Sequence, residues 1–414
     1  MDIELVTVGT ELLLGYTVDT NGAEIGRALA AEGIRLVRRT AVADRPEEIV
    51  AAVAGALSRS GAVLTTGGLG PTRDDMTKSV VAALYEAPLE FDETVWESVV
   101  ARYRRFGRAP AASNRSQAEV PRGATVLPNR WGTAPGLWLD GAPGLTIMLP
   151  GVPAEMRNLL AHEVVPRLRL RAGDRVIRSR MVRTSGIAES TLAEQLGEIE
   201  SELEPLSLAY LPGVAGVDLR ITAWGLEAAA ADAALAAGVA RLTELAGGFA
   251  YGTDEDDLAA VVLGLARQAG LKLATAESCT GGMVGARLTA IPGSSDTFLG
   301  GAICYDNRLK TELLGVDPAT IAAHGAVSEP VAAAMATGVL ARLGADVAVS
   351  VSGIAGPGGG SDEKPVGTVC LGVAGRGPVE TVRTVFGGGR EEIRARAAQG
   401  ALRLLVQRLG AARG

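Results

Sequence analysis

The sequence predicts an α/β protein with two three-layer α/β domains, residues 1–165 and 251–414, joined by a small α+β domain at residues 166–250. A chain of 414 residues is too long for one hydrophobic core, so two or three domains are expected. In both outer parts, short apolar runs alternate with helical segments, as in sheets covered by helices. The 54 glycines suit many tight strand-to-helix turns and are too many for a helical bundle.

The first domain is predicted to contain a parallel sheet. Strands are expected at residues 3–9, 34–42, 61–68 and 144–153, and helices at 21–32, 46–58, 77–87 and from 154 onward. Buried strands that alternate with helices favour parallel pairing and right-handed crossovers. Binding or catalytic residues are therefore expected at the carboxyl ends of these strands.

The middle domain is predicted to be a strand-helix-strand-helix unit. Its strands are expected at 175–185 and 216–225, and its helices at 188–202 and 228–245. The first strand is basic, with arginines at Arg175, Arg178, Arg180 and Arg183. These favour a solvated strand face or a protected sheet edge over a surface for RNA or phosphate, although the sequence leaves both open.

The third domain follows an acidic segment, residues 251–257, that is predicted to be a linker ending at a helix N-terminus. Helices are expected at 258–268, from 281, at 331–343 and from 390, and strands at 271–275, 298–305, 346–353, 366–375 and 379–386. This order again predicts a sheet covered by helices.

Composition narrows the location and the partners. The net charge of −7 gives no general attraction to nucleic acid or membranes. The three cysteines are too few and too scattered for a disulfide framework or a zinc site. The first residues lack the basic segment of a signal peptide, and no apolar run is long enough to span a membrane. A cytoplasmic protein is therefore expected.

The most informative stretch places Ser278 where an apolar run meets Thr280, Gly281 and Gly282. A serine here is either the N-cap of a helix or a nucleophile. The glycines are expected to leave backbone amides uncovered for a phosphate or an oxyanion. A second glycine-rich loop, residues 352–360, follows another strand, and the two loops are expected to face one crevice.

A serine–lysine arrangement is the natural candidate for catalysis because the chain contains only two histidines. Lys310 is expected to act as the base once burial lowers its pKa, and Tyr305 to relay a proton or to orient the lysine. Cys279 is a competing nucleophile, but its ordinary role is that of a buried structural thiol.

These motifs carry a resemblance. The segments ESCTGG, GSS, CYDNRLK, HGAVSEPV and SVSGIAGPGGGSDEKPVGTV resemble the C-terminal domain of the CinA (competence/damage-inducible protein A) family over residues 255–408. The resemblance implies a nicotinamide mononucleotide deamidase that releases ammonia and nicotinate mononucleotide and needs no cofactor. It implies Ser278 as the nucleophile, Lys310 as the base and Tyr305 in support.

The same resemblance implies a set of substrate-binding residues. They are Thr280, Gly281, Gly282, Ser295, Asn307, Ser352, Gly353, Arg390 and Arg394. The last two are alternatives for holding the substrate phosphate. Relatives often carry aspartate where this chain has Gly389, and this difference leaves the choice between the two arginines open.

A further glycine-rich segment, LTTGGLGPTRDDMTK at residues 64–78, ends a predicted strand and opens a helix. Glycines there allow close approach of the backbone to phosphates. Asp74 and Asp75 suit either a divalent cation or capping of the helix, and the pattern alone does not separate the two.

This segment, with VGTELLLGYTVDTN at residues 8–21 and LPGVPAEM at residues 149–156, resembles the molybdopterin-binding-like domain that begins CinA proteins. Over residues 1–165 the resemblance implies hydrolysis of ADP-ribose to AMP and ribose 5-phosphate with a divalent metal ion. The metal ligands that it implies are Asp75 and Asp74. The substrate-binding residues that it implies are Glu11, Asn21, Gly67, Gly68, Gly70, Thr72, Asp74, Lys78 and Asn114, with Asn129, Gly132, Thr133 and Ala134 added to the pocket.

The middle domain corresponds, on the same resemblance, to the KH-like module of the family. It is expected to lack a GXXG loop in a basic context, so direct nucleic-acid binding is not expected. Three hypotheses follow: an enzyme that hydrolyses NAD breakdown products at both sites, a deamidase fused to a non-catalytic nucleotide- or pterin-binding regulatory domain, and a competence-related accessory protein. The family implies a homodimer.

Overall fold

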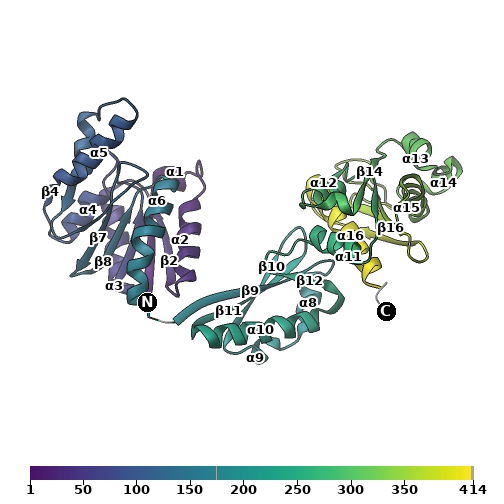
Figure 1. Ribbon diagram of the computed structural model, residues 1–414, viewed down its shortest axis with the longest axis horizontal. Helices are drawn as coiled ribbons and strands as arrows, with labels where there is room; N and C mark the ends of the chain where they lie inside the picture. Colours follow the sequence, from purple (N-terminus) through teal and green to yellow (C-terminus); the bar gives the residue numbers. More distant parts are fainter. Residues whose placement is uncertain (174, 412–414) are drawn as a thin grey trace. The chain divides into compact units, whose positions relative to one another are not determined.

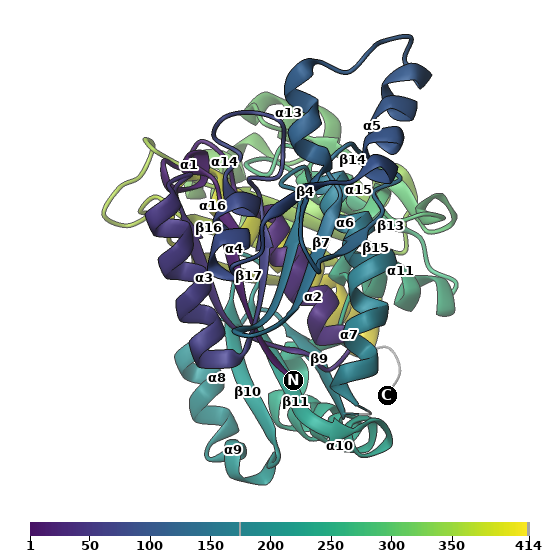
Figure 2. The same ribbon diagram turned by 90° about the vertical axis from the view of Figure 1, so that its left-hand side faces the viewer.

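The computed structural model describes residues 1–173 and 175–411. The chain separates into two compact units, one made of Met1–Arg178 and Thr222–Ala234 and the other of Ser179–Ile221 and Leu235–Gly414. Figure 1 and Figure 2 show that the N-terminal, middle and C-terminal regions each carry their own sheet with helices beside it.

The N-terminal sheet has six strands in the order β2-β1-β3-β8-β7-β6. These strands are β1 (Asp2–Val8), β2 (Arg35–Val42), β3 (Ala62–Thr66), β6 (Thr125–Leu127), β7 (Gly136–Gly141) and β8 (Gly144–Leu149). The first four in the order are parallel, but β7 and β6 are antiparallel, so the prediction of a parallel sheet is wrong at this edge. Only residues 142–143 separate β7 from β8, which is too short for a crossover.

Helices cover both faces of this sheet, so the three-layer prediction is confirmed. They are α1 (Thr10–Leu13), α2 (Thr20–Ala31), α3 (Pro46–Ser60), α4 (Thr77–Leu84), α5 (Glu93–Arg105), α6 (Pro153–Leu159) and α7 (Val165–Ala172). Neighbouring residues of β1 enter different cores: Leu5 packs with α2 and α6, and Val6 packs with α3 and α4. The sequence prediction missed α5 and a small ribbon, β4 (Leu89–Phe91) with β5 (Glu119–Pro121).

The middle domain has four strands in the order β10-β11-β9-β12. Its elements are β9 (Arg175–Thr184), α8 (Glu189–Leu196), α9 (Ile199–Glu202), β10 (Leu206–Pro212), β11 (Val217–Glu227), α10 (Ala228–Ala246) and β12 (Ala250–Thr253). The predicted linker at 251–257 is wrong in its first half, because β12 pairs antiparallel with β9. Its last residue, Asp257, caps the next helix as expected by accepting a hydrogen bond from the Ala259 amide at 2.7 Å.

The C-terminal sheet has five strands in the order β14-β13-β15-β16-β17, of which the first three are parallel. The strands are β13 (Leu273–Glu277), β14 (Phe298–Ile303), β15 (Val347–Gly353), β16 (Thr368–Ala374) and β17 (Glu380–Val385). The helices are α11 (Leu258–Gln268), α12 (Met283–Thr289), α13 (Asn307–Leu314), α14 (Pro318–His324), α15 (Glu329–Leu343) and α16 (Arg390–Ala411). Leu273 packs with α11 and α16, and Ala274 with α13 and α15, so this domain is also three-layered.

The sequence prediction missed α13 and α14 of this domain, although α13 carries Lys310. The three cysteines are buried and free. Among the described residues, no helix is both long and apolar enough to cross a membrane.

Candidate active sites

The position of Ser278 is fixed by the turn between β13 and α12. The buried carboxylate of Glu277 accepts hydrogen bonds from the amides of Gly282, Val284 and Gly285 at 3.0, 3.1 and 2.8 Å. The Ser278 amide donates to the Val351 carbonyl at 2.9 Å, which ties the turn to β15. The free backbone amides at the N-terminus of α12 are thereby hydrogen-bonded within the protein.

This arrangement corrects the expectation that the glycine amides lie uncovered. The Gly281 amide donates to the Ser278 carbonyl at 3.1 Å, and the Gly282 amide donates to Glu277. Both glycines have positive φ, 60° and 98°, which side-chain-bearing residues rarely adopt. The structure therefore supports a role for these glycines in forming the tight turn, and not in donating hydrogen bonds to a substrate.

Lys310 reaches Ser278 directly. Its Nζ lies 3.2 Å from the Ser278 Oγ, 2.9 Å from the Cys304 carbonyl oxygen and 3.3 Å from the Asn307 Oδ1. The side chain is only 1% exposed, and burial lowers the pKa of the Lys310 ammonium from its ordinary value. A lysine held in this way is a base that can become neutral beside the serine hydroxyl.

Tyr305 does not take the position that the sequence analysis gave it. Only its carbonyl oxygen meets the Lys310 Nζ, at 3.4 Å. Its side chain is exposed, and its hydroxyl accepts a hydrogen bond from Arg390 at 3.0 Å. The expected proton relay from the Tyr305 phenol to Lys310 is therefore not present.

A small cavity of about 180 Å³ opens at Ser278. Its remaining wall residues are Cys279, Tyr305, Asn307, Lys310, Ala326, Val327, Ser352, Gly353, Ala355 and Arg390. The two strand-end loops thus face one crevice, as expected, because β13 and β15 are parallel neighbours. The Ser352 hydroxyl donates to the Ala326 carbonyl at 2.7 Å and holds the far wall in place.

The structure separates the two candidate arginines. Arg390 lines the cavity and donates to the Gly356 carbonyl at 2.5 Å. Arg394 instead donates to the carbonyls of Cys279 and Thr280 at 3.1 and 3.0 Å, so it supports the serine turn from behind. The cation at the mouth of the cavity is therefore Arg390.

Two other predicted residues do not face this cavity. Ser295 is exposed and precedes β14, whereas Ser278 follows β13 at the opposite ends of parallel strands, so the two are not brought together. Thr280 is fully buried, and its Oγ1 has no partner among the described residues.

Cys279 sits in the cavity wall but is a poor candidate for the nucleophile. It is buried, and burial raises the pKa of its thiol to about 11. At neutral pH the reactive thiolate is therefore scarce. Close packing also restricts the sulfur, because a Cβ on Gly353 would lie 2.9 Å from the Cys279 Sγ.

A second candidate site lies where the carboxyl ends of β1, β3 and β8 meet. The Asn21 Nδ2 donates to the Thr66 Oγ1 at 3.1 Å and to the Gly151 carbonyl at 2.8 Å, while its buried Oδ1 has no partner among the described residues. Gly67, which follows β3, is packed against backbone, because a Cβ there would lie 2.2 Å from the Val8 carbonyl oxygen. Glu11, on α1, is exposed just beyond the end of β1.

The carboxylates at the start of α4 form only part of a metal site. Asp75 accepts hydrogen bonds from the Thr72 amide, at 2.9 Å, and from its hydroxyl, and it lies against Gly70. Asp74 is exposed, and a hydrogen bond from Thr72 lowers its pKa. No group of three or more metal-ligating side chains occurs in residues 1–173 and 175–411. The pair fits Mg²⁺ only if substrate oxygens and water complete the coordination, which is the usual arrangement for this ion.

Lys78 contacts the short segment that contains Asn114, residues 112–118. Burial lowers the pKa of Lys78 to about 8, and its Nζ donates to the Ser116 carbonyl. Asn114 is buried within the same loop, where its Oδ1 accepts from the Ala111 amide at 2.9 Å and its Nδ2 donates to Gln117 at 3.0 Å. Asn114 therefore shapes the loop through contacts within it.

Glu155 is a titratable residue that the sequence analysis did not single out. It lies on the first turn of α6, just after β8, and burial raises the pKa of its carboxyl group. The Asn129 Nδ2 donates to it at 2.6 Å and to the Ala134 carbonyl at 2.7 Å. The Asn129 Oδ1 accepts from the Gly132 amide at 2.8 Å, so the predicted 129–134 segment is organised around Glu155. The sequence signal that could have identified Glu155 is its position in the motif LPGVPAEM.

Comparison with known protein families assigns each of the three domains to a family. The profile of the CinA C-terminal domain matches residues 255–409, that of a probable molybdopterin binding domain matches residues 4–170, and that of the damage-inducible protein CinA KH domain matches residues 179–252. The predicted order of a molybdopterin-binding-like, a KH-like and a CinA C-terminal domain is confirmed.

Full-length relatives agree with this assignment. A CinA-like protein of Gemmatimonas aurantiaca is 53% identical over 406 residues, covering 97% of this chain and 95% of that protein. A CinA-like protein of Chlorobaculum tepidum is 45% identical over 415 residues, covering 98% of each. The chain therefore belongs to the CinA family.

Solved structures match single parts of the chain. The crystal structure of competence/damage inducible protein CihA from Agrobacterium tumefaciens is 44% identical, covers 36% of this chain and 93% of its own, and has a TM-score of 0.36. That of CinA from Thermoplasma acidophilum, titled as of unknown function, is 38% identical over 39% of this chain and 94% of its own, with a TM-score of 0.36. Family membership indicates a function of the CinA type.

Proposed function

We propose that the C-terminal domain is an amidohydrolase that converts nicotinamide mononucleotide to nicotinate mononucleotide and ammonia. The observation that carries the proposal is the contact of 3.2 Å between the Lys310 Nζ and the Ser278 Oγ inside a buried cavity. Serine paired with a desolvated lysine is an arrangement for nucleophilic attack on an amide. Family membership supports the same type of function.

The proposed chemistry proceeds through an ester on Ser278. Neutral Lys310 takes the hydroxyl proton of Ser278, and the Oγ attacks the carboxamide carbon to form a tetrahedral intermediate. The carbon–nitrogen bond breaks, and Lys310 returns the proton to the departing ammonia. A water molecule, deprotonated by Lys310, then hydrolyses the ester and releases the carboxylic acid, with Ser278 protonated again.

Three acceptors prepare Lys310 for this task. The carbonyls of Cys304 and Tyr305 and the amide oxygen of Asn307 fix the position of Nζ, while burial favours its neutral form. Once neutral, the nitrogen donates its two N–H bonds to two of these acceptors, and its lone pair can accept the Ser278 proton without a movement of the side chain. No other side chain has to act between the two.

The size of the cavity suggests how the substrate lies. About 180 Å³ is below the range of sites that enclose a whole drug-sized ligand, so only the aromatic amide end would enter. The ribose phosphate would remain at the mouth, where Arg390 and the exposed Tyr305 lie. A guanidinium there suits the phosphate.

The test is ammonia release from nicotinamide mononucleotide by the full chain and by Ser278→Ala. We expect rapid release by the wild type and a loss of activity in a variant whose circular dichroism is unchanged. A folded Ser278→Ala protein with full activity would remove Ser278 from the mechanism.

We further propose that the N-terminal domain hydrolyses ADP-ribose to AMP and ribose 5-phosphate with a divalent metal ion. Its support is the buried Asn21 at the meeting strand ends, with an Oδ1 that has no partner among the described residues, and the Asp74 and Asp75 carboxylates in the segment after β3, which suit a cation. We expect AMP formation to depend on added Mg²⁺ and to vanish in Asp75→Ala while ammonia release persists. If no AMP forms either with or without added Mg²⁺, the result would favour a non-catalytic binding domain.

We also propose a cytoplasmic homodimer that acts on these small nucleotides without binding nucleic acid directly. Light scattering of the purified chain tests the dimer. A salt-dependent shift of DNA in a gel would instead favour the competence-related accessory role.

A further inference from the structure

A larger cavity, of about 730 Å³, lies between the middle domain and the C-terminal domain within the second compact unit. Its walls are the 185–189 segment after β9, the β10–β11 turn at 212–217, β17 with the segment that follows it, and one face of α16. It shares no wall residue with the cavity at Ser278. The proposed deamidase mechanism therefore leaves this cavity unused.

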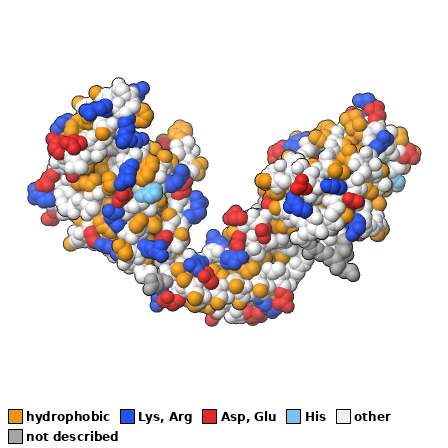
Figure 3. All heavy atoms as spheres, viewed as in Figure 1, with side chains coloured by type: hydrophobic (Ala, Val, Ile, Leu, Met, Phe, Trp, Pro, Cys, Tyr) orange, Lys and Arg blue, Asp and Glu red, His pale blue; other side chains and the backbone are white. Residues whose placement is uncertain are grey.

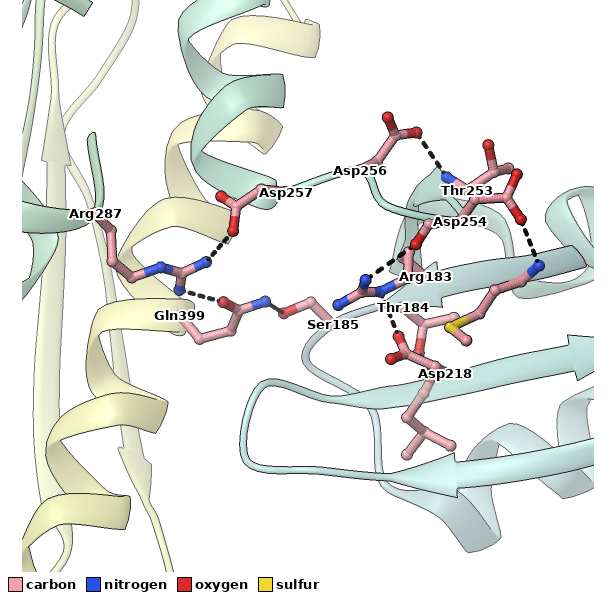
Figure 4. Close-up of polar contacts among 12 residues, drawn as sticks. Arg183, Thr184, Ser185, Asp218, Thr253, Asp254, Asp256, Asp257, Arg287 and Gln399 are labelled. Atoms are coloured by element: carbon pink, nitrogen blue, oxygen red, sulfur yellow. Dashed lines mark hydrogen bonds and ion pairs between the residues drawn. The ribbon is translucent and has the colours of Figure 1, made fainter. Parts of the chain in front are cut away.

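The two sides of the cavity are joined by defined polar contacts (Figure 4). The Gln399 Nε2, on α16, donates to the Ser185 Oγ at 3.2 Å, and the Gln399 Oε1 accepts from Arg287 at 2.5 Å. Arg287 also pairs with Asp257 at 3.5 Å. The 185–189 segment is thus attached to α16 through the buried hydrogen bond between Ser185 and Gln399, which fixes this wall of the cavity.

Three arginines line this cavity, and none of them is neutralised by the part of the chain that the structure describes. Arg383 donates to the Glu363 carbonyl, Arg396 to the Gly387 carbonyl and Arg403 to the Gly186 carbonyl. Within residues 1–173 and 175–411, none of the three is in an ion pair, and Glu189, the acidic residue in the wall, pairs with none of them. The described residues therefore place three cations in this cavity without matching anions.

The neighbouring basic strand behaves differently. Arg178, Arg180 and Arg183 of β9 pair with Asp232, Asp254 and Asp218, respectively. For these three arginines, the ion pairs support a protected strand rather than a ligand surface. The fourth arginine of the strand, Arg175, donates to the Gly225 carbonyl at 3.2 Å.

Arg403 is the strongest single indication of a missing partner. Its Nε is buried and has no hydrogen-bond partner among the described residues, and its contact with the Gly186 carbonyl is long, at 3.3 Å. The guanidinium lies 4.7 Å from the Phe249 ring centroid, which compensates part of the charge. Burial alone lowers the pKa of Arg403, with no opposing carboxylate. A desolvated cation is costly unless an anion accompanies it.

We propose that this cavity binds a phosphate-bearing small molecule of nucleotide size, with Arg396 and Arg403 as the principal phosphate ligands. The two lie seven residues apart on α16 and therefore project from the same face of the helix. Guanidinium groups match phosphate oxygens in pairs. The volume falls in the range of small-molecule sites, and Leu371, Val382 and Phe386 give an apolar wall for a ring.

A polynucleotide is the alternative occupant. Gly213 to Gly216 read GVAG and lie in the wall of this cavity beside the arginines, so the expectation that the middle domain lacks a GXXG segment in a basic context is wrong. A single strand, however, needs a basic groove that follows its backbone. On the face in Figure 3, positive and negative side chains are interspersed, and Arg178, Arg180 and Arg183 of β9 are already paired. These observations favour a small ligand.

The test is hydrogen–deuterium exchange and calorimetry on the full chain, with inorganic pyrophosphate and AMP as probes. We expect either probe to slow exchange in peptides covering residues 212–217 and 382–387. Arg403→Met and Arg396→Met should each weaken binding at this site by about tenfold or more, because each removes a charged hydrogen-bond donor. Arg342→Met, which changes an exposed arginine of α15 outside the cavity, is the matched control and should retain both effects.

Arg390→Met separates this site from the cavity at Ser278, because protection of 212–217 should persist in that variant. If Arg403→Met does not fold, Arg396→Met and the exposed Arg383→Met still decide the question. The proposal is overturned if neither probe protects these peptides, if protection is unchanged in the folded arginine variants, or if only single-stranded RNA gives it. A lower melting temperature of Arg403→Met with unchanged binding would also overturn it, since Arg403 would then only join the two walls.

Discussion

Replacement of Lys310 gives the sharpest examination of the proposed deamidase mechanism. Lys310→Met removes the base that lies 3.2 Å from the Ser278 Oγ while keeping a long apolar side chain in the buried space. Loss of a positioned general base lowers rates by roughly 10²- to 10⁴-fold. At 1.36 kcal/mol for each factor of ten, the barrier should rise by about 3 to 5 kcal/mol. The assay is the initial rate of ammonia release from saturating nicotinamide mononucleotide.

Lys310→Arg is the matched control because it keeps the positive charge and the hydrogen-bond donors. Arginine does not lose its proton in proteins, so it cannot act as a base. If Lys310 acts by accepting the Ser278 proton, Lys310→Arg should lose as much activity as Lys310→Met. If Lys310→Arg retains activity within about tenfold of the wild type, a loss too small for a missing base, the lysine acts as a cation and the reasoning fails.

The pH dependence of the wild-type rate follows from the same contact. Only neutral Lys310 accepts a proton, so the rate should rise with pH and level off above the pKa of this lysine. Burial places that pKa below the ordinary lysine value, and the rise should therefore occur below the pH at which an exposed lysine titrates. A rate that falls over this range would contradict the assignment.

Three further predictions concern the surroundings of Ser278. Cys279→Ala should keep most of the ammonia-release rate, because the buried thiol has a pKa of about 11; a loss comparable to Ser278→Ala would make Cys279 the nucleophile. Arg390→Met should raise the KM for nicotinamide mononucleotide by roughly 10- to 100-fold, because a charged hydrogen bond is lost. The KM for nicotinamide riboside, which has no phosphate, should remain nearly unchanged. Equal effects on both substrates would exclude a contact between Arg390 and the phosphate. Glu277→Gln should lower the free energy of unfolding by about 2 kcal/mol in thermal denaturation, because the carboxylate accepts hydrogen bonds from three backbone amides, those of Gly282 before α12 and of Val284 and Gly285 within it; an unchanged melting temperature would contradict this.

Strand and helix order was largely predictable from the sequence because the domains are regular. Apolar runs such as those of β13 and β15 are long enough to identify buried strands, and glycines follow them at the turns. The hairpin of β7 and β8 was missed because β7 was not recognised as a strand, although residues 140–144 read DGAPG, which is a turn signal between two apolar runs. The short strands β4 and β12 are too brief for any periodic pattern.

The sequence predicted which two residues form the proposed catalytic pair, Lys310 and Ser278, but not how they are positioned relative to each other. Residue types and motifs pointed to both, yet α13, which carries Lys310, was not predicted. The roles of Gly281 and Tyr305 depend on hydrogen bonds that no motif reveals, such as the capture of the α12 amides by Glu277. Arg390 and Arg394 lie one helical turn apart, so only their contacts distinguish them.

The most direct test of the account is the detection of the proposed ester. The wild-type protein is mixed with nicotinamide mononucleotide, quenched in acid and digested, and the peptides that contain residues 277–282 are analysed by mass spectrometry. We predict an added mass equal to that of the substrate less ammonia on Ser278, absent from Ser278→Ala and present in Cys279→Ala. An adduct on Cys279, or ammonia release by Ser278→Ala at the wild-type rate, would contradict the account.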